Sequence, residues 1–288
     1  QKPFHVGTYF PREPRREMPG FLEVLGTLRA KYTDEREEIE ARAADWTEAI
    51  EGEVSTTPDS SGTVGDDVLV AAADTAVKRA DRTHGGFGSG GPKFPQTGRL
   101  RLLLRAHERT GREAYRAVAG EALDAMVEGG IYDQVGGGFH RYATDREWVV
   151  PHFEKMLYDN AEIPRVLLAG YQVTGEDRYA AVARETFDFL RRELRHPEGG
   201  LFSTLDARSA PPDDPEAGEE EGAFYTWTPR GIREAVDDEA DADLFCDRYG
   251  ITEAGNFEGE TVLTRAASVE RLGTDHGLEP EAVEDRLE

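Results

Sequence analysis

Apolar side chains recur every three or four positions through most of this chain, a spacing that predicts amphipathic helices. Between these stretches lie short breaks rich in Gly, Pro, Ser and Thr, which predict turns. We therefore expect helices over residues 19–31, 33–50, 67–82, 113–127, 151–173, 176–194, 229–236 and 240–249, with a further helix beginning at residue 97.

Residues suited to helix N-termini indicate where several of these helices begin. Thr33, Thr97 and Thr228 are expected N-caps, because a threonine hydroxyl accepts a hydrogen bond from a free backbone N–H in the first turn. Pro151 and Pro229 suit the first helical position, where the missing N–H breaks no hydrogen bond.

Changes in composition divide the chain into three parts. Residues 1–11 (QKPFHVGTYFP) alternate like a strand, and residues 52–65 (GEVSTTPDSSGTVG) have the composition of a linker. We expect a first part over 1–51, a linker over 52–65 and a mainly helical domain over 66–288. The chain begins with Gln1 and ends in an expected helix without a glycine C-cap, so we expect it to be a segment of a longer protein.

The helical domain contains an internal repeat. The sequence ERTGREAYRAV at 108–118 matches QVTGEDRYAAV at 172–182, an offset of 64 residues. Glycine turns follow the helix pairs at 85–87, 137–139 and 199–202. Helix pairs whose long loops recur at one end favour a toroidal (α/α) barrel with its pocket at that end, and a plain helical solenoid is the alternative.

Charge and composition narrow the classes of function. The formal net charge is −24 and only five residues are lysines, which fits an acidic, halophilic protein working in high salt. A surface this acidic argues against nucleic acid as a partner. No stretch approaches the ~20 apolar residues of a membrane span and no signal peptide is visible, so we expect a cytoplasmic protein without a membrane partner.

Two further features are assigned no chemistry. Cys246 is the only cysteine, so neither a disulfide framework nor a zinc site of thiolates is expected. The acidic insertion 211–221 (PPDDPEAGEEE) is expected to be solvated.

The candidate chemistry is concentrated in residues 129–160 (GGIYDQVGGGFHRYATDREWVVPHFEKMLYDN). A glycine run that permits sharp backbone turns precedes the first of two histidines. Ionisable and aromatic side chains around such a loop favour a small-molecule pocket, and the alternative is an interhelical loop whose polar groups satisfy one another. The candidate catalytic residues are His140, His152, Glu154 and Asp133. The candidate substrate-binding residues are Arg141, Trp148, Lys155, Tyr158, Asp159, Asp206 and Trp227.

The expected position of His152 suggests a reaction. In the first turn of a helix its imidazole faces the positive end of the helix dipole, which favours a neutral ring that can accept a proton. With His140 on the facing loop, two histidines could exchange a proton beside a sugar carbonyl, as in an epimerase or aldose–ketose isomerase. We expect both rings in one cavity lined by Asp133, Trp148 and Tyr158. The remaining candidates would orient the imidazoles, hold an oxyanion (Arg141, Lys155) or stack on a sugar face (Trp148, Trp227).

Other functions stay open. Asp133, Glu154 and Asp206 could instead flank a glycosidic bond, as the two carboxylates of a glycosidase do. A non-catalytic binding or scaffold barrel is the third alternative. We expect no cofactor and no metal, because the spacing of the two histidines matches no short metal-binding motif.

These residues resemble a known family. The block at 129–160 is similar to the signature of the spermatogenesis-associated protein 20 family of thioredoxin domain-containing proteins. The resemblance extends to GTYFP at 7–11, GGFGSGGPKFP at 85–95, EGAFYTWT at 221–228 and GNFEG at 255–259. One departure is DAR at 206–208, where the family has an Asp-Ala-Asp run.

The resemblance implies an architecture and two partners. Residues 1–51 would be the C-terminal end of a thioredoxin-like domain with connecting helices, whose cysteine motif would lie upstream. Residues 66–288 would be the first half of a six-hairpin (α/α)6 barrel, similar to the barrels of N-acylglucosamine 2-epimerases and six-hairpin glycosidases. The implied partners are a sugar-like small molecule and the upstream thioredoxin-like domain.

Overall fold

The computed structural model describes residues 2–7, 9–15, 18–54, 65–212, 214, 216 and 218–287, with only the backbone of Glu53 and Asp66. The chain divides into two compact units, Gln1–Val64 and Gly65–Glu288. Of the linker expected over 52–65, residues 55–64 lie outside the described residues. No helix in the described ranges is long and apolar enough to cross a membrane.

The first unit contains two helices, α1 (Phe21–Asp34) and α2 (Arg36–Val54). The prediction that Thr33 caps the second helix is wrong: Thr33 lies inside α1, where its hydroxyl donates a hydrogen bond of 2.9 Å to the carbonyl of Arg29. The strand expected near the N-terminus is not formed within residues 2–7 and 9–15. Without a partner strand, alternation of apolar residues does not produce a sheet.

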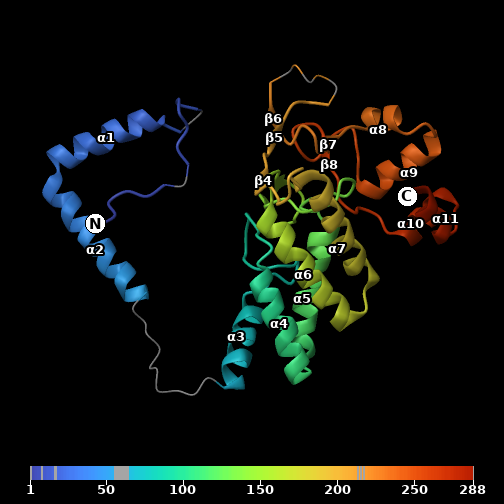
Figure 1. The fold of residues 1–288 in the computed structure, drawn as a ribbon, viewed down its shortest axis with the longest axis horizontal. Coiled ribbons are helices and arrows are strands. Elements are labelled where there is room, and N and C mark those ends of the chain that lie inside the picture. The colour runs from blue at the N-terminus through green and yellow to red at the C-terminus, as the bar shows by residue number, and fades with distance from the viewer. Residues whose placement is uncertain are drawn as a thin grey trace. The chain divides into compact units, whose positions relative to one another are not determined.

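The second unit begins with helices that pack in consecutive pairs, as Figure 1 shows. They are α3 (Asp66–Lys78), α4 (Thr97–Thr110), α5 (Glu113–Glu128), α6 (Leu157–Thr174) and α7 (Asp177–Phe189), the last extended by a π-helical turn over Leu190–Leu194. Helix α4 packs on α3, α5 and α6. Their apolar stripes form one core that includes Leu100, Leu103, Leu123, Val127, Ile163, Val166 and Leu167. The mainly helical class is the predicted one.

The 64-residue repeat is visible in the helix ends. Gly111 and Gly175 end α4 and α6 in the left-handed conformation, with φ of 68° and 78°. This conformation favours glycine and makes the short turn into the next helix possible. The prediction that Thr97 is the N-cap of α4 is wrong. Thr97 is the first residue of the helix, and Gln96, with φ of 44°, is the N-cap.

Three equivalent turns follow α3, α5 and α7. In each turn a backbone N–H donates a hydrogen bond to the carbonyl oxygen of a glycine further along the chain. The bonds run from Asp81 to Gly86 at 2.9 Å, from Asp133 to Gly138 at 3.0 Å and from His196 to Gly200 at 3.2 Å. Side chains added at Gly85 and Gly138 would collide with α5 and α7 respectively, near the C-terminal halves of those helices. The turns therefore lie at the same end of the helices, as the repeat predicted.

Short antiparallel strand pairs join the loops at this end. They are β1 (Tyr142–Ala143) with β2 (Pro151–His152), β3 (Lys155–Met156) with β4 (Thr204–Leu205), β5 (Arg208–Ser209) with β6 (Glu220–Glu221), and β7 (Thr226–Trp227) with β8 (Thr261–Val262). Figure 1 draws most of them beyond one end of α5, α6 and α7.

The prediction that a helix begins at Pro151 is wrong. Pro151 pairs with Ala143 in a strand, and α6 begins only at Leu157. The carboxylate of Asp145 explains this, because it accepts hydrogen bonds from the backbone N–H groups of Val149 and Val150 at 3.1 and 2.5 Å. These bonds turn the chain back on itself, so residues 151–152 run beside 142–143.

The C-terminal residues form four shorter helices. They are α8 (Pro229–Ala235), α9 (Glu239–Tyr249), α10 (Val269–His276) and α11 (Pro280–Leu287). The expected cap of α8 is confirmed, since the hydroxyl of Thr228 accepts a hydrogen bond from Gly231 N and Pro229 is the first helical residue. Cys246 is a buried member of the apolar cluster between α8 and α9.

Candidate functional site

The side chain of His152 is held between two carboxylates. Its Nδ1 lies 2.7 Å from Glu221 Oε1 and its Nε2 lies 3.4 Å from Glu154 Oε2. Arg141 Nη1 in turn lies 2.8 Å from Glu154 Oε2. The ring of Tyr142 packs on His152 with centroids 5.2 Å apart. We call these five residues the His152 cluster.

The reason we gave for a neutral His152 is wrong. His152 lies in strand β2 and not in the first turn of a helix, so no helix dipole acts on it. Its side chain keeps 26 % exposure, so it is accessible to a ligand. Because Glu221 can only accept at Nδ1, that nitrogen carries the hydrogen and Nε2 is the position that can exchange a proton.

The start of α6 adds two candidates beside this cluster. Tyr158 is exposed, and Asp159 is half-buried. Burial raises the pKa of the Asp159 carboxyl to about 7, although the charge of Arg141 acts in the opposite direction. In the described part of the chain, neither Asp159 Oδ2 nor Arg141 Nε has a hydrogen-bond partner.

A cavity of about 540 Å³ borders the His152 cluster at Glu221. Phe224, Trp227 and Phe257 contribute aromatic walls, and Glu258 and Glu260 are among its carboxylates. The volume lies within the range of small-molecule sites. Trp227, a candidate substrate-binding residue, lines this cavity, and so do Glu220 and Glu221 at the end of the acidic insertion, to which we had assigned no chemistry.

Sequence reasoning missed Glu221, Tyr142 and Phe224. The EGAFYTWT block that starts at Glu221 was the available signal, since two of the three residues lie in it. Nothing in the local sequence indicates that Glu221 reaches a histidine 69 positions earlier.

His140 is buried whereas His152 is partly exposed, so the two rings do not face one open cavity as we had predicted. His140 is 2 % exposed, and its Nδ1 is 2.9 Å from the carbonyl oxygen of Phe153. Its ring packs against Phe153 and Tyr225. Burial lowers the pKa of His140 to about 3, so its imidazole is neutral.

Asp133 lines the same small cavity as His140, together with Tyr225 and Trp227. Asp133 is paired with Lys155, whose Nζ lies 2.6 Å from Asp133 Oδ2. Burial alone would raise the pKa of Asp133, but the charge and hydrogen bond of Lys155 hold it below its usual range. Lys155 is 1 % exposed and is therefore not available to a ligand's oxyanion in this arrangement.

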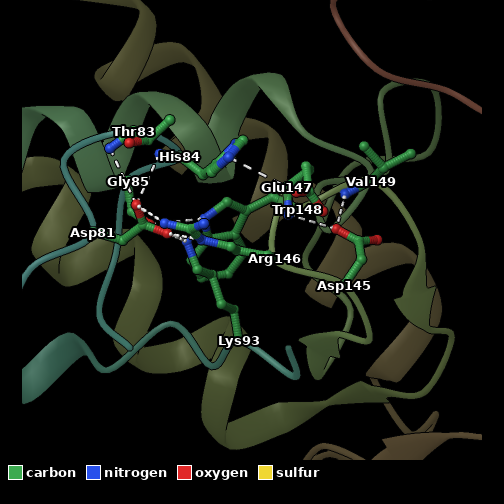
Figure 2. Close-up of polar contacts among 10 residues, drawn as sticks. All are labelled: Asp81, Thr83, His84, Gly85, Lys93, Asp145, Arg146, Glu147, Trp148 and Val149. Carbon is green, nitrogen blue, oxygen red and sulfur yellow. Dashed lines mark hydrogen bonds and ion pairs between the residues drawn. The ribbon is translucent and has the colours of Figure 1, made fainter. Parts of the chain in front are cut away.

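Trp148 lies in a third group, shown in Figure 2. It is 1 % exposed, and its Nε1 is 3.4 Å from the carbonyl oxygen of Gly85. Asp81 binds both Lys93, at 2.8 Å, and the Arg146 guanidinium, at 2.7 and 2.9 Å. Trp148 is thus a core residue of this Asp81 cluster, and the prediction that it lines a cavity with His140 is wrong.

Asp206 is exposed, and its Oδ1 accepts a hydrogen bond of 2.9 Å from Arg208 N in its own turn. Its carboxylate therefore stabilises a turn and does not belong to the His152 cluster. Across the described ranges no group of three or more His, Cys, Asp and Glu side chains has a metal-binding arrangement.

Two family models match parts of the chain. Residues 1–51 match Thioredox_DsbH, described as "Protein of unknown function, DUF255", and residues 96–225 match N-acylglucosamine 2-epimerase. Solved structures with a similar chain path include a cellobiose 2-epimerase from Spirochaeta thermophila DSM 6192, with TM-score 0.42 and 23 % identity over 50 % of this chain and 42 % of that chain. The cellobiose 2-epimerase from Bacillus thermoamylovorans B4167 has TM-score 0.44 and 15 % identity over 64 % of this chain and 55 % of that chain.

Full-length sequence relatives give the broadest match. Spermatogenesis-associated protein 20 of Homo sapiens is 34 % identical over 320 residues, which cover 99 % of this chain and 39 % of the relative. The protein of the same name from Rattus norvegicus is 33 % identical over 314 residues, which cover 98 % of this chain and 38 % of the relative. The chain thus spans about two fifths of the length of these relatives. Nearly the whole length of the chain is thus similar in sequence to spermatogenesis-associated protein 20 of three mammals.

Proposed function

We propose that the second unit binds a sugar in the cavity bordered by Glu221 and Trp227, and that His152 moves a proton beside the sugar carbonyl. The observation that carries the proposal is the imidazole of His152, held at both nitrogens by carboxylates at the edge of a cavity with aromatic walls. The match of residues 96–225 to the N-acylglucosamine 2-epimerase model supports a sugar as the ligand.

The hydrogen bonds of His152 define its role in this proposal. Glu221 fixes the hydrogen on Nδ1; the bound sugar displaces Glu154 from Nε2, and the lone pair of Nε2 then takes the proton from the carbon next to the carbonyl. The electron pair of the broken C–H bond moves to the carbonyl oxygen and forms an enediolate. In this proposal Arg141, which is paired with Glu154, supplies the positive charge that stabilises this oxygen.

Because only His152 of the two candidate histidines is accessible, the arrangement favours isomerisation over epimerisation. Epimerisation needs an acid and a base on opposite faces of the sugar carbon, and His140 is buried with its pKa lowered to about 3. Isomerisation between an aldose and a ketose needs only one group, which moves the proton between neighbouring carbons on one face. The burial of His140 therefore supports a single-histidine version of the reaction rather than the two-histidine one.

Glycoside hydrolysis is a second candidate, because Asp159 has the property of a general acid. A carboxyl whose pKa is raised to about 7 is protonated at neutral pH and can donate to a leaving group. Glu154 would then be the second carboxylate.

Hydrogen exchange with solvent separates these functions. The full-length protein should incorporate deuterium from D₂O beside the carbonyl of at least one aldose among glucose, mannose, N-acetylglucosamine and cellobiose. His152→Gln should reduce that rate by about 10²–10⁴, while the matched change His5→Gln, at an exposed histidine of the first unit, should leave it unchanged.

Two results would contradict the proposal. Undiminished exchange in His152→Gln would show that another group moves the proton. Glycoside hydrolysis that Asp159→Asn abolishes, without any exchange, would assign the site to the second candidate.

A further inference from the structure

The first glycine turn is built on a buried lysine–aspartate pair. Lys93 Nζ lies 2.8 Å from Asp81 Oδ2 and 2.6 Å from the carbonyl oxygen of Gly85, and both side chains are at most 1 % exposed. The other oxygen of Asp81 accepts from the backbone N–H groups of Thr83 and His84, at 3.1 and 3.2 Å.

The second glycine turn repeats this arrangement. Lys155 Nζ lies 2.6 Å from Asp133 Oδ2 and 2.9 Å from the carbonyl oxygen of Gly137. Asp133 Oδ1 accepts from Val135 N and Gly136 N at 3.1 and 2.8 Å. The lysine, the aspartate and the backbone groups therefore make the same contacts in both turns, so a difference between the turns can be traced to what surrounds them.

The two turns differ in the number of cations that bind the aspartate. In the first, the Arg146 guanidinium binds Asp81 through Nε and Nη2, so one carboxylate holds two cations (Figure 2). In the second, the only cation paired with Asp133 among the described residues is Lys155. Asp133 also lines a small cavity of about 10 Å³, enough for one water-sized group.

Two of the side chains that line this cavity, Asp133 and His140, present acceptors. Because His140 Nδ1 faces a carbonyl oxygen, Nδ1 carries the hydrogen and Nε2 is an acceptor. No hydrogen bond reaches that nitrogen from the described residues, and His140 is 2 % exposed and lines the cavity. The amide of Gln134 is already occupied, since it donates to the carbonyls of Val127 and Gly129 and accepts from Arg265.

We propose that the cavity between Asp133 and His140 is a binding site for one small cation with N–H donors, either free ammonium or the ammonium end of an amine. Such a cation occupies the place on Asp133 that the Arg146 guanidinium takes on Asp81. It donates to the carboxylate and to His140 Nε2 at once, which a sodium or potassium ion cannot do by directional hydrogen bonds. The site differs from the His152 cluster and does not depend on the reaction proposed there.

Ammonium binding can be followed at His140 itself. In full-length protein labelled with ¹⁵N only at histidine, ammonium chloride should shift the Nε2 resonance of His140 saturably, with a dissociation constant on the order of 1 mM. Potassium chloride at the same ionic strength should not shift it. Asp133→Asn should weaken the response about tenfold or more, and Asp237→Asn, which removes an exposed carboxylate, should leave it unchanged. Methylammonium distinguishes the two ligands, since a response to methylammonium as well as to ammonium indicates that the site accepts the ammonium end of an amine.

Three results would overturn the assignment: no saturable shift with either amine, an equal shift with potassium, or a full response in Asp133→Asn. If circular dichroism shows that Asp133→Asn does not fold, His140→Phe replaces it. Ammonium should then raise the melting temperature of the parent protein above its value in potassium chloride but not that of His140→Phe, and an equal rise in both would also contradict the site.

Discussion

Replacing Asp81 with Asn tests how strongly the buried ion cluster stabilises the second unit. Asp81 is 5 % exposed and joins Lys93, Arg146 and two backbone amides. The asparagine keeps the size of the side chain but leaves the ammonium of Lys93 buried without a counter-charge. Removing one partner of a buried pair costs about 3–5 kcal/mol of unfolding free energy, and we expect a loss in this range at about pH 7.

The pH dependence of that loss follows from the pKa of Asp81. The hydrogen bond from Arg146 is the largest cause that holds this pKa well below its usual range, and the bond from Lys93 adds to it, although burial acts against both. A carboxyl with a depressed pKa in the folded state contributes stability above its unfolded pKa and loses it as the pH falls through the folded value. The difference between parent and Asp81→Asn should therefore shrink below about pH 4.

Urea unfolding followed by circular dichroism measures both quantities, with Asp237→Asn as the control for losing an exposed carboxylate. A cost below about 1 kcal/mol for Asp81→Asn, the typical limit of a surface ion pair, would refute the reasoning. A cost that does not change between about pH 7 and pH 3 would show that the effect is steric and not electrostatic.

Two further predictions concern single positions. As the pH rises from about 4 to about 8, the unfolding free energy of the parent should fall by about 2 kcal/mol relative to that of Asp159→Asn, because a carboxyl pKa raised by burial to about 7 favours the protonated folded state. This figure is about half the full linkage value, to allow for partial exposure, and comparing the two proteins cancels the contribution of other groups such as His140. A parent protein that does not lose stability relative to the variant at the higher pH would contradict the prediction. Gly86→Ala should lower the free energy of unfolding, measured in urea, by about 2 kcal/mol more than Gly200→Ala does. Both glycines have φ near 80°, but only a side chain at Gly86 would collide with the ring of Trp148. Equal losses in the two variants would show that Trp148 moves aside freely.

Apolar periodicity predicted the helices because helix packing depends on it directly. Residues 113–127 became α5 (Glu113–Glu128), and the repeat predicted the equivalent turns. Local signals failed where a distant or competing hydrogen bond decides the backbone. Pro151 is compatible with a helix start, but the carboxylate of Asp145 turns the preceding loop and gives Pro151 a strand partner.

The sequence indicated which stretch of the chain holds the candidate residues, but not how their side chains are arranged in space. Asn160, which is fully buried, binds the backbone of Phe139 on both sides, with its Oδ1 2.6 Å from Phe139 N and its Nδ2 2.8 Å from Phe139 O. This holds the neighbouring His140 inward, while the β1–β2 pair presents His152 outward to Glu221. Sequence spacing carries no information about these long-range contacts, so it could not separate the two histidines.

A crystal structure of the full-length protein soaked with the same sugars tests the central claim most directly. We predict a sugar in the cavity lined by Trp227 and Glu221, with the carbon next to its carbonyl within about 3.5 Å of His152 Nε2, the distance from which a proton can be transferred. A sugar bound elsewhere, with His152 still closed between Glu154 and Glu221, would contradict it.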